Sequence, residues 1–240
     1  MNGNKISILS TGIDIKLPAE EEGYVIDMAA FIGSRRVENA ALTEKIQRLG
    51  SQPLCAVFTS RRAVEAIASW LGKQQTPWSI YCLGGTTRDL AEKYFGKTAI
   101  IGTADDASRL AELISQGKKI KEVHFFCGNR RREELPQILS RAHIAVEEMV
   151  VYDTWDEPRH IDKKYDAILF FSPSAVRSYF SLNVPAGETV LFALGNSTAT
   201  EIKKHWDGPV RQPIRPDQSL LLSEVLEYFH LPKDEAINEK

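Results

Sequence analysis

The chain has 240 residues and a formal net charge of −2, from 30 basic and 32 acidic residues. This length allows one large domain or two smaller ones, with a substantial buried core. The balanced charge argues against a generalised nucleic-acid-binding surface. The three cysteines are far apart and form no Cys-x-x-Cys pair, so we expect buried free thiols in a reducing compartment.

Several familiar kinds of site are missing from the sequence. It contains no P-loop, no Gly-x-Gly-x-x-Gly motif and no Gly-x-Ser-x-Gly hydrolase elbow. The five histidines are scattered without metal-ligand spacing, so we expect no metal site. The first residues, MNGNKISILS, lack the apolar run of a signal peptide, and no apolar stretch reaches 18 residues. We therefore expect a cytoplasmic protein that does not bind a membrane.

Short apolar, β-branched runs alternate with helical spacing almost throughout the chain. Strands separated by helices predict βαβ units, parallel sheets and an α/β fold. In chain order we expect strands Ile6–Ser10 and Tyr24–Ile32, helix Val37–Leu49, strand Leu54–Thr59, helix Arg62–Leu71, strand Ser79–Leu83, helix Thr87–Phe95, strand Thr98–Ile101, helix Ala107–Ser115, strand Glu122–Cys127, helix Arg131–Arg141, strands Ile144–Tyr152 and Asp166–Phe171, helix Ser174–Leu182, strand Thr189–Leu194, helix Thr198–Trp206, strand Val210–Pro213 and helix Ser219–Phe229.

An internal repeat organises this alternation. VFTSRRAVEAI begins at Val57, and LFFSPSAVRSY begins 112 residues later, at Leu169. LGGTTRDLA, from Leu83, recurs after 111 residues as LGNSTATEI, and DASRLAELI, from Asp106, recurs after the same interval as DQSLLLSEV. Three matches at nearly one offset indicate two copies of one α/β unit.

The second copy is predicted to be circularly permuted. The first copy continues with KEVHFFCG and HIAVEEMVVY, and the similar segments KISILSTG and YVIDMAAFI lie near the N-terminus. We therefore predict a discontinuous domain of residues 1–33 and 157–240, into which the domain of residues 34–152 is inserted. The chain crosses between them near residues 30–35 and 150–157, where two extended segments are predicted to pair as a connector. The predicted functional space is the cleft between the domains.

Seven motifs follow one another along nearly the whole chain: VFTSRRAVEA, LGGTTRDLA, FFCGNRRREELPQIL, VVYDT, ILFFSPSAVRSYF, ALGNSTATEI and PDQSLLLSEVL. Each motif is weak alone, but in this order and spacing they resemble the uroporphyrinogen-III synthases. The fold that the resemblance implies, two α/β domains joined by a two-stranded connector, agrees with the architecture that the repeat predicts. One departure is that many members carry Arg-Pro after the first strand, where this chain reads STGIDI (Ser10–Ile15). A substrate contact from an arginine at that place is therefore missing.

The resemblance implies a function. Members of the family close the linear tetrapyrrole hydroxymethylbilane to uroporphyrinogen III and invert ring D during closure, without a metal or an organic cofactor. By resemblance, this chain is then a monomeric enzyme of haem biosynthesis that binds no nucleic acid. Its small-molecule substrate would arrive by transient hand-off from hydroxymethylbilane synthase.

The strand-to-helix turns are the predicted substrate-binding positions. The implied substrate carries carboxylates on each of its pyrroles, and strand ends and helix starts gather at one edge of a parallel sheet. Backbone N–H groups and hydroxyls there can bind carboxylates without a high net positive charge. The predicted substrate-binding residues are Thr59, Ser60, Arg61, Gly85, Thr86, Thr87, Gly128, Asn129, Arg130, Ser172, Pro173, Ser174, Asn196, Ser197 and Thr198.

A simpler interpretation of these turns is that Ser, Thr and Asn only cap the helices that follow. Capping and ligand binding are compatible, because a capping side chain occupies one N–H group and leaves others free. Arginines in a first helical turn oppose the helix dipole, which favours an anionic partner. Of Arg130, Arg131 and Arg132 we expect at most two to reach the cleft.

Tyr152 is the predicted catalytic residue. It ends the strand EEMVVY at the second crossing, and the resemblance places a family tyrosine of this motif near the substrate. A phenol is a hydrogen-bond donor at neutral pH, so it can assist loss of the bilane hydroxyl. Without the resemblance, a connector tyrosine is the simpler interpretation. Acid–base catalysis by paired carboxylates lacks support, since no acidic residue stands out at a strand-to-helix turn.

Two other functions stay open on the residues alone. One is a non-catalytic, hinge-type sensor that binds a polycarboxylate between two α/β lobes, which makes nearly the same demands on the sequence. The other is a transferase acting on a phosphorylated sugar or nucleotide, for which the expected glycine motif and acidic ribose-binding residue are not found. The resemblance favours the synthase.

Overall fold

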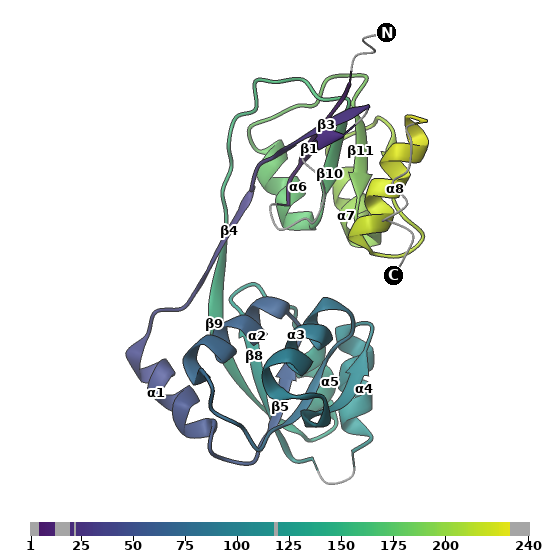
Figure 1. Ribbon diagram of the computed structural model, residues 1–240. Coiled ribbons are helices and arrows are strands. Elements are labelled where there is room, and N and C mark those ends of the chain that lie inside the picture. The colour runs from purple at the N-terminus through teal and green to yellow at the C-terminus, as the bar shows by residue number, and fades with distance from the viewer. Residues whose placement is uncertain (1–4, 13–19, 22, 118–119, 231–240) are drawn as a thin grey trace. The chain divides into compact units, whose positions relative to one another are not determined.

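A computed structural model describes residues 5–12, 20, 21, 23–117 and 120–230 (Figure 1). The chain divides into unit 1, which combines Met1–Gly33 with Trp155–Lys240, and unit 2, which is Ser34–Thr154. Each unit has its own sheet and its own hydrophobic core. Ile13–Ile15, in the segment that departs from the family pattern, lie outside the described residues.

The sheet of unit 1 has the strand order β12-β11-β10-β1-β3-β2. Its N-terminal strand β1 is central and pairs in parallel with both β10 and β3, whereas β2 is antiparallel to β3. This pairing confirms the prediction that the N-terminal strands complete the sheet of the C-terminal part. The strands are β1 (Ile6–Ser10), β2 (Glu20–Glu21), β3 (Tyr24–Met28), β10 (Ala167–Phe170), β11 (Val190–Ala193) and β12 (Val210–Arg211).

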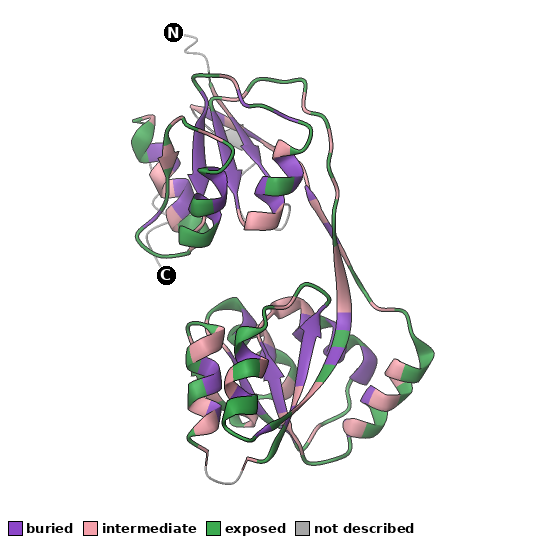
Figure 2. Ribbon diagram, turned by 180° about the vertical axis from the view of Figure 1, so that it is seen from behind, coloured by how far each residue is buried: buried purple, intermediate pink, exposed green. Residues whose placement is uncertain are grey.

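Helices cover both faces of the sheet of unit 1. Helix α8 (Gln218–Tyr228) packs its leucines and Val225 against one face, and α6 (Pro173–Phe180) and α7 (Asn196–Ile202) pack against the other. The central strands are consequently buried on both sides (Figure 2). Their continuous apolar sequences follow from this, since a parallel sheet has no solvent face.

The sheet of unit 2 has the same arrangement of strands when it is read from the opposite edge. It runs β4-β9-β8-β5-β6-β7, and the five strands from β9 to β7 pair in parallel. Strands β8 and β9 occupy the places that β1 and β3 hold in unit 1, as expected for a circularly permuted copy. The strands are β4 (Ile32–Arg36), β5 (Cys55–Phe58), β6 (Ser79–Leu83), β7 (Ile100–Ala104), β8 (Glu122–Gly128) and β9 (Ala145–Asp156).

The helices of unit 2 lie in two layers. Alternating side chains of β8 explain the layers: Phe126 faces the cluster formed with α1, α2 and α3, whereas Phe125 and Cys127 face α4 and α5. Among the helices that the structure describes, none combines the length and the apolar character needed to cross a membrane. The helices are α1 (Ala40–Leu49), α2 (Arg61–Leu71), α3 (Thr86–Phe95), α4 (Ala107–Ser115) and α5 (Glu134–Arg141), with a 3-10 turn at Lys97–Ala99.

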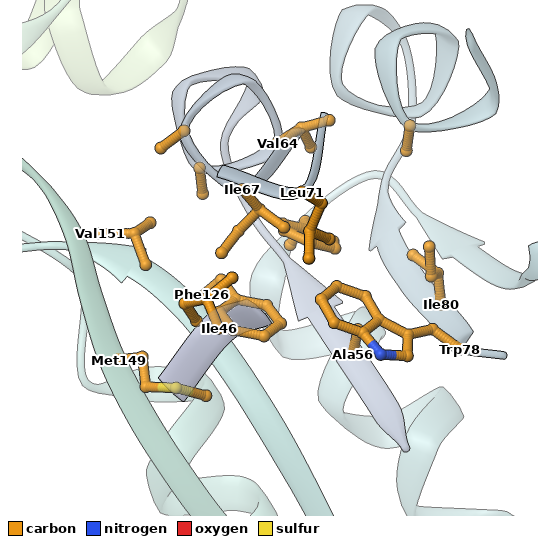
Figure 3. Packing of buried hydrophobic residues seen from close by; sticks show 14 of the residues in the cluster. Ile46, Ala56, Val64, Ile67, Leu71, Trp78, Ile80, Phe126, Met149 and Val151 are labelled. Carbon is orange, nitrogen blue, oxygen red and sulfur yellow. The ribbon is translucent and has the colours of Figure 1, made fainter. Parts of the chain in front are cut away.

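Stacked aromatic rings fill the core under α1–α3. The Trp78 ring stacks on Phe126 with a centroid distance of 5.4 Å (Figure 3). The Phe58 ring also stacks on Phe126, with a centroid distance of 5.2 Å. The indole N–H of Trp78 donates to the carbonyl of Leu49 at 2.9 Å, so its polar atom is satisfied inside the core. Phe126 therefore contacts aromatic partners from two neighbouring segments at once.

Several predicted element boundaries are wrong, among them those of β3, α1 and α7. The predicted strand Tyr24–Ile32 is two strands of different sheets, β3 and β4, because the chain bends where Phe31 enters the core of unit 1. Helix α1 begins at Ala40 rather than Val37, because the Val37 N–H pairs with the carbonyl of Val151. Helix α7 ends at Ile202 rather than Trp206, and the last residues form turns back to the Ile202 carbonyl.

Replacing the stacked phenylalanine, Phe126→Ala, should strongly destabilise unit 2. A Phe→Ala change in a packed core costs about 3–5 kcal/mol through lost burial and a residual cavity. Denaturant unfolding of the variant measures this loss. Tyr94→Ala is the control, since Tyr94 is 48% exposed and should change stability by less than about 1 kcal/mol. Equal losses in both variants would contradict the packing described.

An acidic residue of β3 makes the stability of unit 1 depend on pH. The Asp27 carboxylate accepts hydrogen bonds from Lys163 Nζ at 2.6 Å and from the Tyr165 hydroxyl at 2.8 Å. The hydrogen bond from Lys163 contributes most to lowering the pKa of Asp27, and the one from Tyr165 adds to it. Partial burial acts in the opposite direction and raises this pKa. A carboxyl with a lowered pKa stabilises the fold above its unfolded pKa of about 3.9, and this contribution is lost as the pH falls through the folded pKa.

Asp27→Asn should therefore lower the stability at pH 7 but not near pH 2. Because the pair is about half exposed, we expect a loss under about 1 kcal/mol at neutral pH. The measurement is thermal unfolding of wild type and variant across this pH range. Asp207→Asn is a matched control, since Asp207 is exposed and has no ion-pair partner among the described residues. A gap between wild type and Asp27→Asn that stays constant with pH would contradict the assignment.

Candidate functional site

A cavity of about 600 Å³ lies at the carboxyl ends of the parallel strands of unit 2. Strands β5, β6, β7 and β8 end at this edge because parallel neighbours run the same way. Tyr152 of β9 also borders the cavity. The lining residues are Thr59, Ser60, Leu83, Asp105, Asp106, Ala107, Ser108, Phe125, Gly128, Arg130, Arg131, Arg132, Glu134, Leu135 and Tyr152.

Tyr152 is held over Gly128. The β8–β9 register shifts between Cys127 and Gly128, so that Gly128 pairs with Tyr152. A Cβ on Gly128 would lie 2.5 Å from the Tyr152 ring, which explains why this strand end is a glycine. The Tyr152 hydroxyl bonds to no residue that the structure describes. A half-buried phenol that borders a cavity with an unused hydroxyl can donate to a ligand.

The sequence predicted that β9 ends at Tyr152, but the strand continues to Asp156. Asn129 supports this extension. Its backbone N–H donates to the Tyr152 carbonyl at 3.2 Å, its Oδ1 accepts from the Thr154 N–H at 2.9 Å, and its Nδ2 donates to the Thr154 carbonyl at 3.2 Å. The Asn129 amide, predicted to bind substrate, is thus occupied by β9.

Three arginines precede helix α5, which begins at Glu134 rather than at Arg131. They therefore belong to a loop and not to a first helical turn. All three line the cavity, whereas at most two were expected to reach the site. Arg131 is paired with Glu133 at 2.6 Å and with Glu148, and these hydrogen bonds raise its pKa. Arg132 is exposed and has no partner among the described residues, so its charge is available.

Two aspartates face the same cavity. Strand β7 ends at Ala104, three residues later than predicted, so Asp105 and Asp106 occupy the turn before α4. The Asp106 carboxylate accepts from the Arg109 N–H at 2.8 Å and caps the helix. No acidic residue stood out in the sequence at a strand-to-helix turn, but these two aspartates lie at one and line the cavity. The lining of the cavity is therefore mixed in charge, with both arginines and carboxylates.

The helix caps repeat between the two units. Ser60 caps α2 by accepting from the Arg62 N–H, and Ser172 caps α6 by accepting from the Ala175 N–H, both at 3.2 Å. Helices α3 and α7 instead begin after Gly85 and Gly195, which provide no side-chain cap. The first N–H groups of α3 and α7 are therefore open to another acceptor. Ser60 and Ser172 therefore cap helices, as the simpler interpretation of these turns predicted.

The remaining predicted residues lie at the turns as expected but differ in access. Thr87 and Thr198 are buried, with 7% and 3% exposure, so their hydroxyls are not available to a ligand. The Asn196 Oδ1 accepts from Gln212 Nε2 at 2.8 Å, which occupies that oxygen. Thr59 lines the cavity and Arg61 does not. The other positions at the turns are Thr86 and Ser197, both exposed, and Pro173 and Ser174, both half-buried.

The cysteines do not line the cavity. Burial raises the pKa of Cys127 to about 12 and that of Cys82 to about 11, so neither is a thiolate at neutral pH. All three cysteines are free, and Cys55 is only half-buried. Within the described part of the chain, no three His, Cys, Asp or Glu side chains are grouped so that they could hold a metal ion.

Comparisons with known proteins identify the family of the chain. Residues 14–223 match the family model described as uroporphyrinogen-III synthase HemD. The structure is similar to that of a mutant uroporphyrinogen III synthase from the extremely thermophilic bacterium Thermus thermophilus, with a TM-score of 0.65 and 14% identity over 94% of this chain and 99% of that one. It is also similar to uroporphyrinogen-III synthetase from Helicobacter pylori, with a TM-score of 0.66 and 15% identity over 93% and 99%. The chain belongs to the uroporphyrinogen-III synthase family, the enzymes that make this porphyrin precursor in haem biosynthesis.

Proposed function

We propose that the chain closes hydroxymethylbilane to uroporphyrinogen III with inversion of ring D, through a spirocyclic pyrrolenine and with net loss of water. The observation that carries this proposal is the unused Tyr152 hydroxyl at a cavity that three arginines border. A phenol supplies a proton donor for a leaving hydroxyl, and cations suit a substrate with many carboxylates.

The chemistry needs one proton donor and tight control of geometry. The electron-rich pyrrole expels the hydroxyl as Tyr152 donates a proton to it, so that water leaves and an azafulvene forms. The substituted carbon of ring D then attacks the exocyclic carbon to give the spirocycle. This intermediate fragments, and the free ring-D position recloses the ring and loses its proton. The proton released from ring D returns the Tyr152 phenolate to its phenol form, so the atoms balance to one water lost.

Carboxylate binding is proposed to rest on charge and on backbone donors together. In unit 2, Arg132 is the available cation, and the uncapped start of α3 offers N–H groups. In unit 1, the uncapped turn at Asn196 and Ser197 and the turn at Ser172 and Ser174 are the equivalent positions. We propose that these turns bind other carboxylates of the same substrate.

Positioning is proposed to be the main catalytic effect. Hydroxymethylbilane also closes without an enzyme, by direct attack of the free ring-D position, and this gives isomer I. Holding the reacting rings in one geometry can supply much of the barrier reduction. The ratio of isomer III to isomer I therefore reports the function directly.

A coupled assay tests the proposal. The protein is incubated with porphobilinogen and hydroxymethylbilane synthase, and the porphyrin isomers are resolved after oxidation. We expect isomer III to dominate when the protein is present and isomer I when it is omitted. Isomer I alone at high protein concentration would overturn the proposal and would favour a polycarboxylate sensor.

Tyr152→Phe should slow turnover without changing the isomer that the enzyme releases. A positioned general acid contributes about 10²–10⁴-fold, and the push from the pyrrole should keep the loss near 10²-fold. The measurement is turnover and isomer ratio as the variant concentration rises until enzymatic closure outruns the spontaneous reaction. Nearly pure isomer III is expected there. Wild-type turnover would remove Tyr152 from the mechanism, and persistent isomer I would show that it enforces geometry instead.

Arg132→Gln should weaken substrate binding with little effect on stability. Loss of one charge-assisted hydrogen bond should raise KM about 5- to 30-fold. Arg131→Gln is the matched variant from the same loop. It breaks the pairs with Glu133 and Glu148 and should lower thermal stability by a few degrees, with a smaller effect on KM. The opposite pattern in the two variants would contradict the assignment of the available cation.

A further inference from the structure

We propose that Asn129 is a positioning residue whose side-chain amide acts as an additional strand residue beside β9 and thereby fixes Tyr152 over the cavity. The proposal rests on the proposed role of Tyr152. Strand β8 ends at Gly128, whereas β9 continues to Asp156. Beyond Tyr152, the backbone of β9 no longer has β8 beside it.

Asn129 takes the place of that neighbour. A primary amide carries one acceptor and one donor group, like a peptide bond. Here the Asn129 Oδ1 accepts from the Thr154 N–H at 2.9 Å and the Nδ2 donates to the Thr154 carbonyl at 3.2 Å. Both polar groups of Thr154 on this side of β9 are therefore bonded to one side chain, as a strand would bond them.

The same residue also holds Tyr152. The backbone N–H of Asn129 donates to the Tyr152 carbonyl at 3.2 Å. Three hydrogen bonds thus join Asn129 to β9 at two residues of the same face, Tyr152 and Thr154. Together with Gly128, whose Cβ position lies 2.5 Å from the ring, they leave the tyrosine little freedom.

This arrangement commits the Oδ1 and one Nδ2 hydrogen of Asn129 to β9, which favours a positioning role for the amide over a direct contact with substrate. Asn129 does not line the cavity, and both of its amide atoms are bonded to Thr154. Asparagine suits the position because shorter or apolar side chains lack one or both bonds. Its effect on catalysis must therefore pass through Tyr152.

The decisive experiment is a double-mutant cycle of Asn129→Ala with Tyr152→Phe. In the wild-type background, Asn129→Ala should lower kcat about 10- to 100-fold with a smaller change in KM, because a misplaced catalytic group loses rate before binding. In the Tyr152→Phe background, the same change should alter kcat less than about 3-fold. Equal factors in both backgrounds would overturn the proposal and assign Asn129 to the substrate.

Hydrogen exchange tests the geometry without turnover. The Thr154 amide should exchange at least about 10-fold faster in Asn129→Ala than in wild type, since its acceptor is gone. An unchanged rate would overturn the proposal. If the wild type formed no isomer III, the proposed function would fail, but this exchange result would still decide whether Asn129 holds β9.

Asn183→Ala is the matched control for the loss of a structural asparagine. The Asn183 amide also bonds backbone groups, accepting from the Ile161 N–H at 2.8 Å and donating to the Arg159 carbonyl at 2.9 Å. It follows the C-terminal end of α6, at the opposite end from the Ser172 turn. This variant should lose stability yet keep the kcat of its folded fraction and the Thr154 exchange rate. A fall in kcat equal to that of Asn129→Ala would reduce Asn129 to a purely structural residue and overturn the proposal.

Discussion

Parallel pairing of the strands is the constraint on which the rest of each unit depends. It sends the carboxyl end of every paired strand to one edge of its sheet and puts the start of the next helix beside it. Caps, loop arginines and the end of β9 gather at that edge in unit 2, although they come from distant parts of the sequence. The fold itself therefore brings these groups together at one edge of the sheet.

The repeat shows which features of that edge both copies keep. The helix that follows β5 in unit 2 and the helix that follows β10 in unit 1 are both capped by serine. The next helix in each unit starts after glycine. Serine satisfies one N–H group internally, whereas glycine leaves the first turn open. The arginine loop and the tyrosine belong to unit 2 alone. The two copies thus share helix starts without a side-chain cap, and unit 2 adds the arginine loop and the Tyr152 phenol.

The sequence was sufficient for the fold class, the repeat and the permuted sheet, because apolar periodicity and a constant offset depend on the core. Predictions from the sequence were wrong where polar contacts determine the residue at which a helix or strand begins or ends. The Gly102–Ala104 segment lacks a strand-like apolar pattern, so the end of β7 and the aspartates after it were missed. Arg131 was assigned to a helix because its pairing with Glu148 on β9 depends on the tertiary structure. Asn129 looked like a ligand residue because nothing in its neighbours reveals that β9 continues past Tyr152.

The place of β1 in the middle of a sheet also has a consequence for biosynthesis. Ser7 and Asp166, which are joined by a hydrogen bond, are 159 residues apart in the chain. At a synthesis rate of about 5–20 residues per second, the first apolar strand waits roughly 10 to 30 s for its neighbour β10. All the strands from β5 to β9 leave the ribosome during that interval. The inserted unit can therefore close its sheet first, while β1 still lacks its partner β10. During that interval the unpaired edge of β1 is open to aggregation.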